Sequence, residues 1–362
     1  MSTQFECYDC HTLFPIKISH ICPVCGGSFG ISGSISYDPK LIDATLPGIW
    51  KYRHSFGLPE NARPISLGEG NTPLIKSKIF NSEVFFKTEY QNPTGSFKDR
   101  LTSPEISYLK SLGINYAVDD SSGNAGASFA AYSRRANIKG KVFVPANASG
   151  PKRKQISAYG VKIVEVDGPR SAASTAVLEA INEGATYASH AYLPQGIPGL
   201  ATIAYELVEQ LEQPTGSVIA PVGHGSLLLG IIKGFEALLN VGIIERFPNI
   251  IGVQAKECAP IFSKNLGGQE KENQVKEGET LAEGVRVLNP VHGDQLIKMA
   301  EQYPIEFVDV EENKILKGRD ELAALGFYVE LTSAIVWDAL KQTIEALPKP
   351  IVVILTGSGL KS

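Results

Sequence analysis

Short apolar runs alternate with longer amphipathic stretches from residue 84 to the end of the chain. The runs are rich in β-branched and aromatic residues and predict strands at 84–87, 116–119, 142–145, 161–166, 185–189, 218–222, 250–254 and 351–355. The stretches between several of them have helical length, at 98–112, 125–135, 151–159, 172–182, 200–210, 227–239, 314–325 and 332–345. Strands that alternate with helices predict an α/β fold with parallel-rich sheets, whose ligands bind at the carboxyl ends of the strands.

The first 35 residues lack this alternation and hold four of the five cysteines. Cys7 and Cys10 form one CxxC pair, and Cys22 and Cys25 form a second. A CxxC turn directs two thiolates at one ion, so two such turns supply the four sulfur ligands of a tetrahedral Zn²⁺ site. A redox or disulfide pair is the alternative, but two pairs so close together favour zinc. Four thiolates leave no position for a substrate, so the zinc is predicted to be structural.

Composition and charge argue against several classes of protein. Lys and Arg number 34 against 38 Asp and Glu, and this net charge of −4 argues against nucleic-acid and anionic-membrane partners. No apolar run reaches the ~20 residues of a membrane helix, and the best candidate, 226–235, contains Lys233. The start, MSTQFECYDC, lacks the basic and apolar regions of a signal peptide. We therefore expect a cytoplasmic protein of about two main domains.

The segment from Gln91 to Arg100 reads QNPTGSFKDR. Asn-Pro-Thr-Gly predicts a turn, and Ser96 can cap the helix that follows. Lys98 then lies in the first helical turn, where the positive end of the helix dipole lowers the pKa of an ammonium group. A Schiff-base lysine needs such a lowered pKa, although a lysine in a first turn is more often only a solvated charge.

A second segment, Ser121 to Ser128, reads SSGNAGAS and follows the predicted strand that ends at Asp119. Small residues and hydroxyls at the start of a helix leave backbone N–H groups free to bind an anion. An ordinary tight turn between a strand and a helix has a similar composition.

Two further glycine loops also follow predicted strands. Pro221 to Ser226 reads PVGHGS and precedes a helix, so its glycines allow close approach of a phosphate; it is neither a Walker motif nor GxGxxG. Leu355 to Gly359 reads LTGSG and lies at the end of the last predicted strand, where ligands of α/β proteins bind.

Together with LGEGNTPL at 67–74, these motifs occur in a recognisable order. The set resembles the threonine synthase branch of fold-type II pyridoxal-phosphate (PLP) enzymes, over about residues 60 to 362. The wider family includes serine/threonine dehydratases, cysteine synthase and the tryptophan synthase β chain. An N-terminal zinc ribbon also occurs in relatives of threonine synthase.

The resemblance implies roles in cofactor binding. Lys98 would form the Schiff base with PLP and later transfer protons, while Phe97 would shape the site beside it. Asn124 would hydrogen-bond the 3-hydroxyl, and Thr356 would face the pyridine nitrogen. A neutral hydroxyl does not protonate that nitrogen, which makes the ring a weaker electron sink and favours elimination. The cofactor phosphate would be held by Gly223, His224, Gly225 and Ser226.

The resemblance also implies a set of substrate-binding residues, namely Thr94, Ser121, Ser122, Gly123 and Ala125. One expected segment is missing. Threonine synthases usually carry an Asn-Ser-x-Asn-Pro-x-Arg-x-x-Gly-Gln-Lys-Thr stretch that binds the phosphate of O-phosphohomoserine. Here residues 189–202 read SHAYLPQGIPGLAT, without the arginine that a phosphate dianion normally requires.

Three functions follow from these observations. The first is a threonine synthase that eliminates phosphate and adds water. The second is a β-eliminating or β-replacing enzyme on another amino acid, similar to threonine/serine dehydratase or cysteate synthase. The third is a zinc-ribbon protein that binds a ligand without turnover.

By resemblance, the architecture is the tryptophan synthase β-like fold, with PLP in a cleft between two α/β domains. The expected domains are a zinc ribbon at 1–35, a large domain at 36–89 and 191–362, and a small domain at 90–190. Closure of the small domain would exclude water. A homodimer is expected on the same basis.

Overall fold

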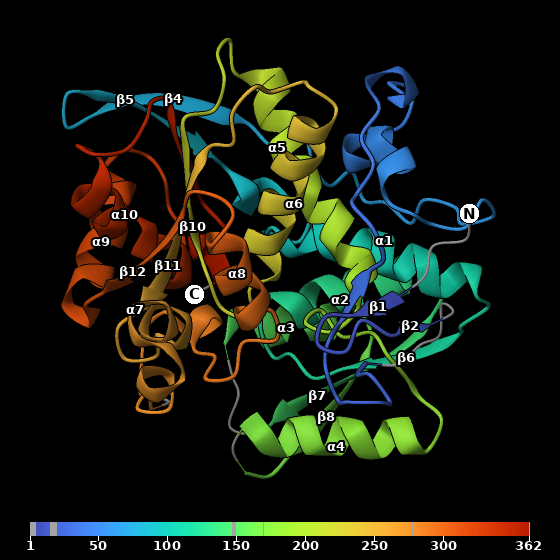
Figure 1. Cartoon of the computed structure of the whole chain (residues 1–362). Helices are drawn as coiled ribbons and strands as arrows, with labels where there is room; N and C mark the ends of the chain where they lie inside the picture. Colours follow the sequence, from blue (N-terminus) through green and yellow to red (C-terminus); the bar gives the residue numbers. More distant parts are fainter. Residues whose placement is uncertain (1–4, 15–19, 147–149, 169, 277, 362) are drawn as a thin grey trace. The chain divides into compact units, whose positions relative to one another are not determined.

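The computed structural model describes residues 5–14, 20–146, 150–168, 170–276 and 278–361 (Figure 1). The chain forms two compact units. Among the described residues, the first unit contains those up to Gly70, Asn92–Gly199 and Lys361. The second contains Asn71–Gln91 and Leu200–Leu360. Residues 36–70 thus group with the first unit, whereas the sequence assigned them to the large domain; the domain assignment itself stays a prediction.

The first unit is built on a four-stranded parallel sheet with the order β8-β7-β6-β9. Its strands are β6 (Tyr116–Asp119), β7 (Lys139–Pro145), β8 (Lys162–Val166) and β9 (Thr186–Tyr187). Its helices are α1 (Lys98–Ser111), α2 (Asn124–Arg135), α3 (Pro151–Ala158) and α4 (Arg170–Asn182). This alternation of parallel strands and helices confirms the predicted α/β class.

Successive residues of a strand point to opposite faces, and the sheet of the first unit shows this directly. Ala117 packs in one core with residues of α1, α2 and α3. Its neighbour Val118 packs in a second core with Phe143 and with Val177 of α4. Helix α4 accordingly lies along β7 and β8 (Figure 1). Both faces of the sheet are therefore covered, as a parallel sheet requires.

A small antiparallel sheet precedes these elements, with the order β2-β1-β3. Its strands are β1 (Phe5–Cys7), β2 (Leu13–Phe14) and β3 (Phe29–Ile31). The core of this ribbon consists of only Phe5, Cys7, Cys22 and Phe29 among the fully described residues, with Cys10 and Phe14 packed against it. Two aromatic rings and two thiols are a small core for an independent unit, so a further stabilising element is required.

The second unit is built on a six-stranded sheet with the order β12-β11-β10-β13-β5-β4. All neighbours are parallel except β4, which pairs with β5 as an antiparallel hairpin. The strands are β4 (Leu74–Ile79), β5 (Ser82–Lys87), β10 (Ser217–Pro221), β11 (Asn249–Ala255), β12 (Ile305–Val310) and β13 (Ile351–Ile354). The carboxyl ends of β10 and β13 therefore lie side by side.

Helices of the second unit share its core with the strands. They are α5 (Ile197–Gln210), which starts in the first unit, α6 (Ser226–Asn240), α7 (Pro260–Glu272), α8 (Gly293–Ala300), α9 (Glu312–Ala324) and α10 (Leu331–Thr343). Residues of α9 and α10 pack with those of β5, β10, β11 and β13 in one large apolar cluster. Helices α9 and α10 lie next to each other (Figure 1). No helix in the described ranges is long and apolar enough to cross a membrane.

The sequence pattern did not predict β4, β12, α7 or α8. Only Ile79 of β4 is buried, because this hairpin strand lies at the edge of the sheet, so its apolar pattern is weak. Helix α7 likewise buries only Pro260 and Ile261 among its described side chains. Weak burial does not explain the other two, because β12 buries Ile305, Phe307 and Val310 and α8 buries Leu296 and Met299.

Candidate active site

Lys98 is the first residue of α1, as predicted. The turn before it closes with a 2.8 Å hydrogen bond from Gly95 N–H to the Asn92 carbonyl, and Gly95 has a φ of +87°. Lys98 Nζ lies 4.7 Å from the centre of the Phe97 ring, so Phe97 packs beside the lysine as expected. The expectation that Ser96 caps the helix is wrong: Phe97 is the N-cap, and the buried Ser96 hydroxyl has no hydrogen-bond partner in the described part of the chain.

Asp99, next to the lysine, is a buried carboxylate with neutral donors around it. Its oxygens accept 2.6 Å hydrogen bonds from the Thr94 N–H, the Thr94 hydroxyl and the Ser128 hydroxyl. Burial outweighs these bonds and raises the pKa of Asp99 to about 6. The Ser128 bond joins α2 to the first turn of α1, and so fixes the helix that starts with Lys98. The sequence placed Thr94 among the substrate-binding residues. In this structure the Thr94 hydroxyl donates a hydrogen bond to Asp99.

The second motif forms the turn between β6 and α2. Asn124 is the first residue of α2, and Gly123 is its N-cap. The Ser121 hydroxyl accepts a 3.2 Å hydrogen bond from Gly123 N–H. A side chain on Gly126 would lie 1.8 Å from the Ser121 carbonyl oxygen, so only glycine lets the helix start this close to the turn. Residues Ser121 to Ala125 thus surround the amino end of a 12-residue helix, which favours an anion.

The third motif joins β10 to α6 in the second unit. Gly225 is the N-cap of α6 with a left-handed φ of +97°, a conformation that costs other residues about 1–2 kcal/mol. The backbone of the loop is fixed by a 3.0 Å hydrogen bond from His292 N–H to the His224 carbonyl. The N–H groups of Gly223, Gly225 and Ser226 have no acceptor among the described residues. Three such donors at a helix start are suited to a phosphate.

Thr356 follows β13, the neighbour of β10 in the sheet. Its N–H donates to the Ser333 hydroxyl of α10 at 2.9 Å, which fixes the backbone. Its side chain is only 2% exposed, and its Oγ1 has no hydrogen-bond partner in the described part of the chain. A buried hydroxyl without a partner costs free energy, so this atom fits a site for an external hydrogen-bonding group such as a ring nitrogen.

The LGEGNTPL motif contributes a buried carboxylate, Glu69, that accepts several hydrogen bonds. Glu69 is fully buried, and its Oε1 accepts from the Trp50 indole at 2.9 Å and from the Ser103 hydroxyl of α1 at 2.5 Å. Its Oε2 accepts from the Tyr132 hydroxyl of α2 at 2.6 Å, and from Leu67 N–H and Ser66. Glu69 therefore anchors the motif to both helices that carry predicted site residues, and sequence reasoning gave it no role.

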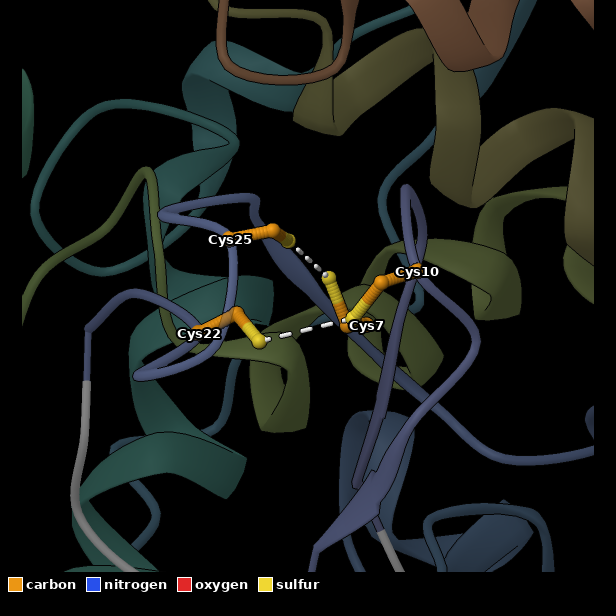
Figure 2. A group of neighbouring side chains, drawn as sticks. All are labelled: Cys7, Cys10, Cys22 and Cys25. Atoms are coloured by element: carbon orange, nitrogen blue, oxygen red, sulfur yellow. Dashed lines mark hydrogen bonds between the residues drawn. The ribbon is translucent and has the colours of Figure 1, made fainter.

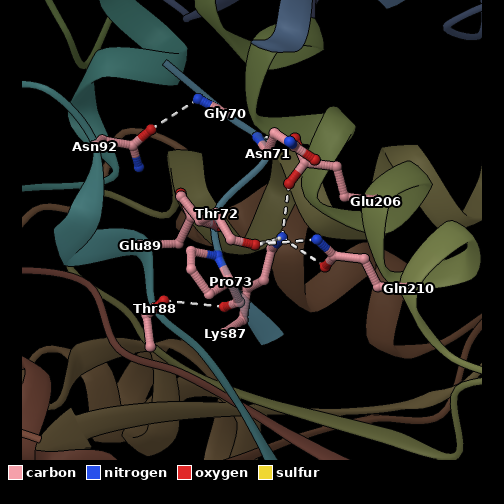
Figure 3. A network of polar contacts seen from close by, with 10 residues as sticks. All are labelled: Gly70, Asn71, Thr72, Pro73, Lys87, Thr88, Glu89, Asn92, Glu206 and Gln210. Atoms are coloured by element: carbon pink, nitrogen blue, oxygen red, sulfur yellow. Dashed lines mark hydrogen bonds and ion pairs between the residues drawn. The ribbon is translucent and has the colours of Figure 1, made fainter. Parts of the chain in front are cut away.

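The same motif continues into the second unit, where it meets a buried ion pair (Figure 3). Lys87 Nζ lies 2.6 Å from Glu206 Oε2 and also donates to the Thr72 carbonyl at 2.7 Å. Gln210 Oε1 accepts from the same ammonium at 2.8 Å, and Glu206 Oε1 accepts from Asn71 N–H at 2.7 Å. These contacts tie Asn71 and Thr72 to β5 and α5.

The four ribbon cysteines converge in the first unit (Figure 2). All four sulfur atoms lie within 4.8 Å of one another, with Sγ–Sγ distances of 3.4 Å for Cys7–Cys25 and 3.7 Å for Cys10–Cys22. A tetrahedral zinc with bonds of about 2.3 Å requires sulfur separations of roughly 3.8 Å. Disulfide bonds, at about 2.05 Å, do not fit these distances.

The two CxxC turns repeat the same backbone geometry. His11 N–H donates to the Cys7 carbonyl at 3.0 Å, and Gly26 N–H donates to the Cys22 carbonyl at 2.8 Å. Both donors have a positive φ, +55° for His11 and +78° for Gly26. A side chain on Gly27 would lie 2.9 Å from Cys7 Sγ, so glycine leaves room for the sulfur cluster. Contacts with Thr12 lower the pKa of the Cys10 thiol to about 6.

Known proteins are similar to this chain in sequence and in fold. The family described as pyridoxal-phosphate dependent enzymes matches residues 65–357. Threonine synthase of Methanocaldococcus jannaschii is 32% identical over 87% of this chain and 80% of its own length. Threonine synthase of Methanosarcina acetivorans is 28% identical over 99% of this chain and 92% of its own length.

Solved structures show the same fold at lower identity. A fungal L-serine ammonia-lyase from Rhizomucor miehei has a TM-score of 0.68 at 20% identity, covering 79% of this chain and 93% of its own. Maize serine racemase has a TM-score of 0.66 at 22% identity, covering 80% of this chain and 88% of its own. Fold, family match and the motifs at 67–74, 91–100, 121–128, 221–226 and 355–359 agree. The chain belongs to the pyridoxal-phosphate dependent enzymes of fold type II, in their threonine synthase branch.

Proposed function

We propose that the protein converts O-phospho-L-homoserine and water into L-threonine and inorganic phosphate. The observation that carries this proposal is the similarity to threonine synthases of 28–32% identity over 86–99% of the chain. Bound PLP supplies an electron sink for negative charge that develops on the amino acid.

The residues of the first unit would hold the cofactor covalently and bind the amino acid. Lys98 would bind PLP and carry protons to and from the substrate carbons, with Phe97 against its side chain. Asn124 would bind the cofactor hydroxyl. The amino end of α2 would bind the substrate carboxylate through the residues around its N-cap, Ser121, Ser122, Gly123 and Ala125, and Thr94 from the turn before α1 would contribute as well. The helix dipole and the N–H groups at that end support this role.

The residues of the second unit would hold the polar ends of PLP. The loop Gly223, His224, Gly225 and Ser226 would bind its phosphate, and the N–H groups without acceptors support that role. Thr356 would donate a hydrogen bond to the ring nitrogen from its buried hydroxyl. Because a hydroxyl is too weak an acid to protonate that nitrogen, this arrangement favours elimination over transamination.

The test is a steady-state assay with purified, PLP-loaded protein. We expect equal amounts of phosphate and threonine from O-phospho-L-homoserine. Lys98→Ala should lose both the activity and the visible absorbance of lysine-bound PLP. Lys110→Ala, an exposed lysine in the same helix, is the matched control and should keep both. If wild-type protein releases no phosphate, this substrate is excluded.

A second function is favoured by one observation. Residues 189–202, where the phosphate-binding arginine is expected, contain no arginine or lysine. The side chain of His190 from this segment instead lies 3.4 Å from the carboxylate of Asp119. An acidic neighbour disfavours a phosphate dianion. The second function is therefore β-elimination or β-replacement on an amino acid without a phosphate. Keto-acid release from threonine or serine, without phosphate release from O-phospho-L-homoserine, would establish elimination.

We further propose that Cys7, Cys10, Cys22 and Cys25 bind one structural Zn²⁺. The sulfur separations and the repeated turn support it, and zinc would supply the stability that the small ribbon core lacks. Metal analysis should find one zinc per chain in the wild type. Cys7→Ser should lose it, whereas Cys258→Ser, a buried cysteine outside the ribbon, should not. Equal zinc content in Cys7→Ser and wild type would contradict the site.

The resemblance also supports a cytoplasmic homodimer. Light scattering of the purified protein should give the mass of two chains. A monomeric mass at micromolar concentration would contradict the dimer.

A further inference from the structure

A second cluster of metal-ligating side chains lies at the carboxyl edge of the four-stranded sheet. Asp119 ends β6, Asp120 follows it, and His190 comes shortly after β9. Because β6 and β9 are parallel neighbours, their ends emerge side by side. One ligand atom from each of the three side chains lies within 4.8 Å of the others. The chain thus brings together two carboxylates and an imidazole from two places about 70 residues apart in the sequence.

The two carboxylates and the imidazole lie in a largely buried place, with Asp120 half-buried. Asp119 is fully buried and His190 nearly so. Asp119 Oδ1 and His190 Nδ1 are 3.4 Å apart, longer than the ~2.8 Å of a strong charge-assisted hydrogen bond. In the described part of the chain, no lysine or arginine forms an ion pair with either aspartate. A protonated His190 could balance only one of the two carboxylates, so further positive charge would stabilise the cluster.

Neutral donors fix the orientation of both carboxylates. The Ser174 hydroxyl donates to Asp120 Oδ2 at 2.7 Å, and the Tyr187 hydroxyl donates to Asp120 Oδ1 at 2.9 Å. Ser121 N–H donates to Asp119 Oδ2 at 3.3 Å. Metal-binding carboxylates are typically oriented by such outer hydrogen bonds.

Glu105 of α1 is a further buried carboxyl group in the first unit. Its side chain is almost fully buried, and its Oε1 has no hydrogen-bond partner among the described residues. Burial and the charge of Asp119 both raise the pKa of Glu105, whereas Lys98 lowers it. Glu105 is therefore subject to the charges of both Asp119 and Lys98.

We propose that Asp119, Asp120 and His190 bind a divalent first-row cation in addition to the ribbon zinc. Two carboxylate oxygens and one imidazole nitrogen suit Mn²⁺ or a similar ion, because oxygen ligands favour Mn²⁺ and imidazole favours transition metals over Ca²⁺. A set of three ligands leaves coordination positions for water or for an anionic oxygen. Since Asp119 also binds Ser121 N–H, the cation would fix the turn between β6 and α2. The proposal does not depend on the reaction proposed above.

The test is a Mn²⁺ titration of the full-length, zinc-loaded and PLP-loaded protein, followed by the electron paramagnetic resonance signal of free Mn²⁺. We expect one Mn²⁺ bound per wild-type chain. Asp120→Asn should weaken binding by at least about tenfold, because it removes one ligand charge while its oxygen can still accept from Ser174. Glu183→Gln is the matched control: Glu183 is exposed just after α4 and loses the same charge. It should bind as the wild type does.

A second measurement keeps the test informative when a variant is less stable. Mn²⁺ should raise the Tm of the wild type and of Glu183→Gln, because a ligand that binds only the folded state stabilises it. It should not raise the Tm of Asp120→Asn or His190→Ala. The proposal is overturned if wild-type protein binds no Mn²⁺ at millimolar concentration. It is also overturned if Asp120→Asn and His190→Ala bind Mn²⁺ as the wild type does.

Discussion

In the first unit Glu69 is buried as a lone carboxylate among neutral donors, whereas in the second Lys87 is buried as an ion pair with Glu206. Glu69 accepts from an indole, a backbone N–H and three hydroxyls. The loss of one of those donors leaves the other hydrogen bonds in place. The loss of Lys87 removes a buried positive charge 2.6 Å from the carboxylate of Glu206, which is more costly in a buried place.

Both networks belong to one sequence motif. LGEGNTPL contributes Glu69 to the first unit, and its Asn71 and Thr72 join the Lys87 network in the second. Glu69 also bonds to α1, which begins with the predicted catalytic Lys98. The two networks show that LGEGNTPL holds other elements in place through hydrogen bonds. The motif therefore identifies the family through residues that position the chain, not through residues that react.

The largest effect is expected at the ion pair. Lys87→Met should lower the free energy of unfolding of the protein by about 3–5 kcal/mol, because the buried carboxylate of Glu206 then loses the adjacent ammonium charge. Urea unfolding followed by far-UV circular dichroism measures this loss. The double variant Lys87→Met/Glu206→Gln should recover much of it, since glutamine is neutral and can still accept from Asn71 N–H. An equal loss in the single and double variants would show that charge is not the cause.

A second prediction tests the lone carboxylate of Asp99, whose pKa rises from 3.8 to about 6 in the folded state. The folded state holds this proton more tightly than the unfolded chain does, so stability falls as pH rises from about 4 to about 6. Each pKa unit corresponds to about 1.4 kcal/mol, so the loss approaches ~3 kcal/mol. Asp99→Asn should remove this pH dependence. The measurement is urea unfolding of both proteins across that pH range; parallel curves would contradict the raised pKa.

Much of the architecture could be predicted from local pattern. The strand at 116–119 and the start of α1 at Lys98 were predicted to the residue. A short β-rich run marks the strand, and turn residues precede the helix. The four-cysteine cluster was also predictable, since ligand spacing along the chain fixes it. The roles assigned to the individual active-site residues stay predictions.

Other features depend on tertiary neighbours that no local pattern reports. Asp99 stands beside the lysine in the motif, but only the fold shows that Thr94 and Ser128 bind it. Serine is a common N-cap residue, so the sequence favoured Ser96 as the cap. The N-cap is instead Phe97, one residue later, and the helix begins at Lys98. The cluster of Asp119 and His190 requires the pairing of β6 with β9, which the sequence alone does not give.

The third prediction concerns Glu69. Glu69→Gln keeps the shape of the side chain but turns one acceptor oxygen into an NH₂ donor. The hydroxyls can rotate and accept from it, but the Trp50 indole on one oxygen and the Leu67 N–H on the other can only donate. One of these donors must therefore lose its acceptor, at a cost of about 1–3 kcal/mol. Urea unfolding measures it. A cost equal to that of Lys87→Met would contradict the distinction between lone carboxylate and ion pair.

The smallest effect is expected at a surface pair with the same geometry as the buried one. Lys76 Nζ and Glu83 Oε1 are 2.6 Å apart on β4 and β5, the same separation as between Lys87 and Glu206. The side chains of the surface pair are 57% exposed, against 0% and 1% in the buried pair. Lys76→Gln should therefore cost no more than about 1 kcal/mol, because water solvates Glu83 when its partner is lost. The cost should fall further in about 1 M salt, which screens exposed charges, whereas the cost of Lys87→Met should change little. If the two substitutions cost the same in urea unfolding, separation and not burial would decide the strength of an ion pair in this protein.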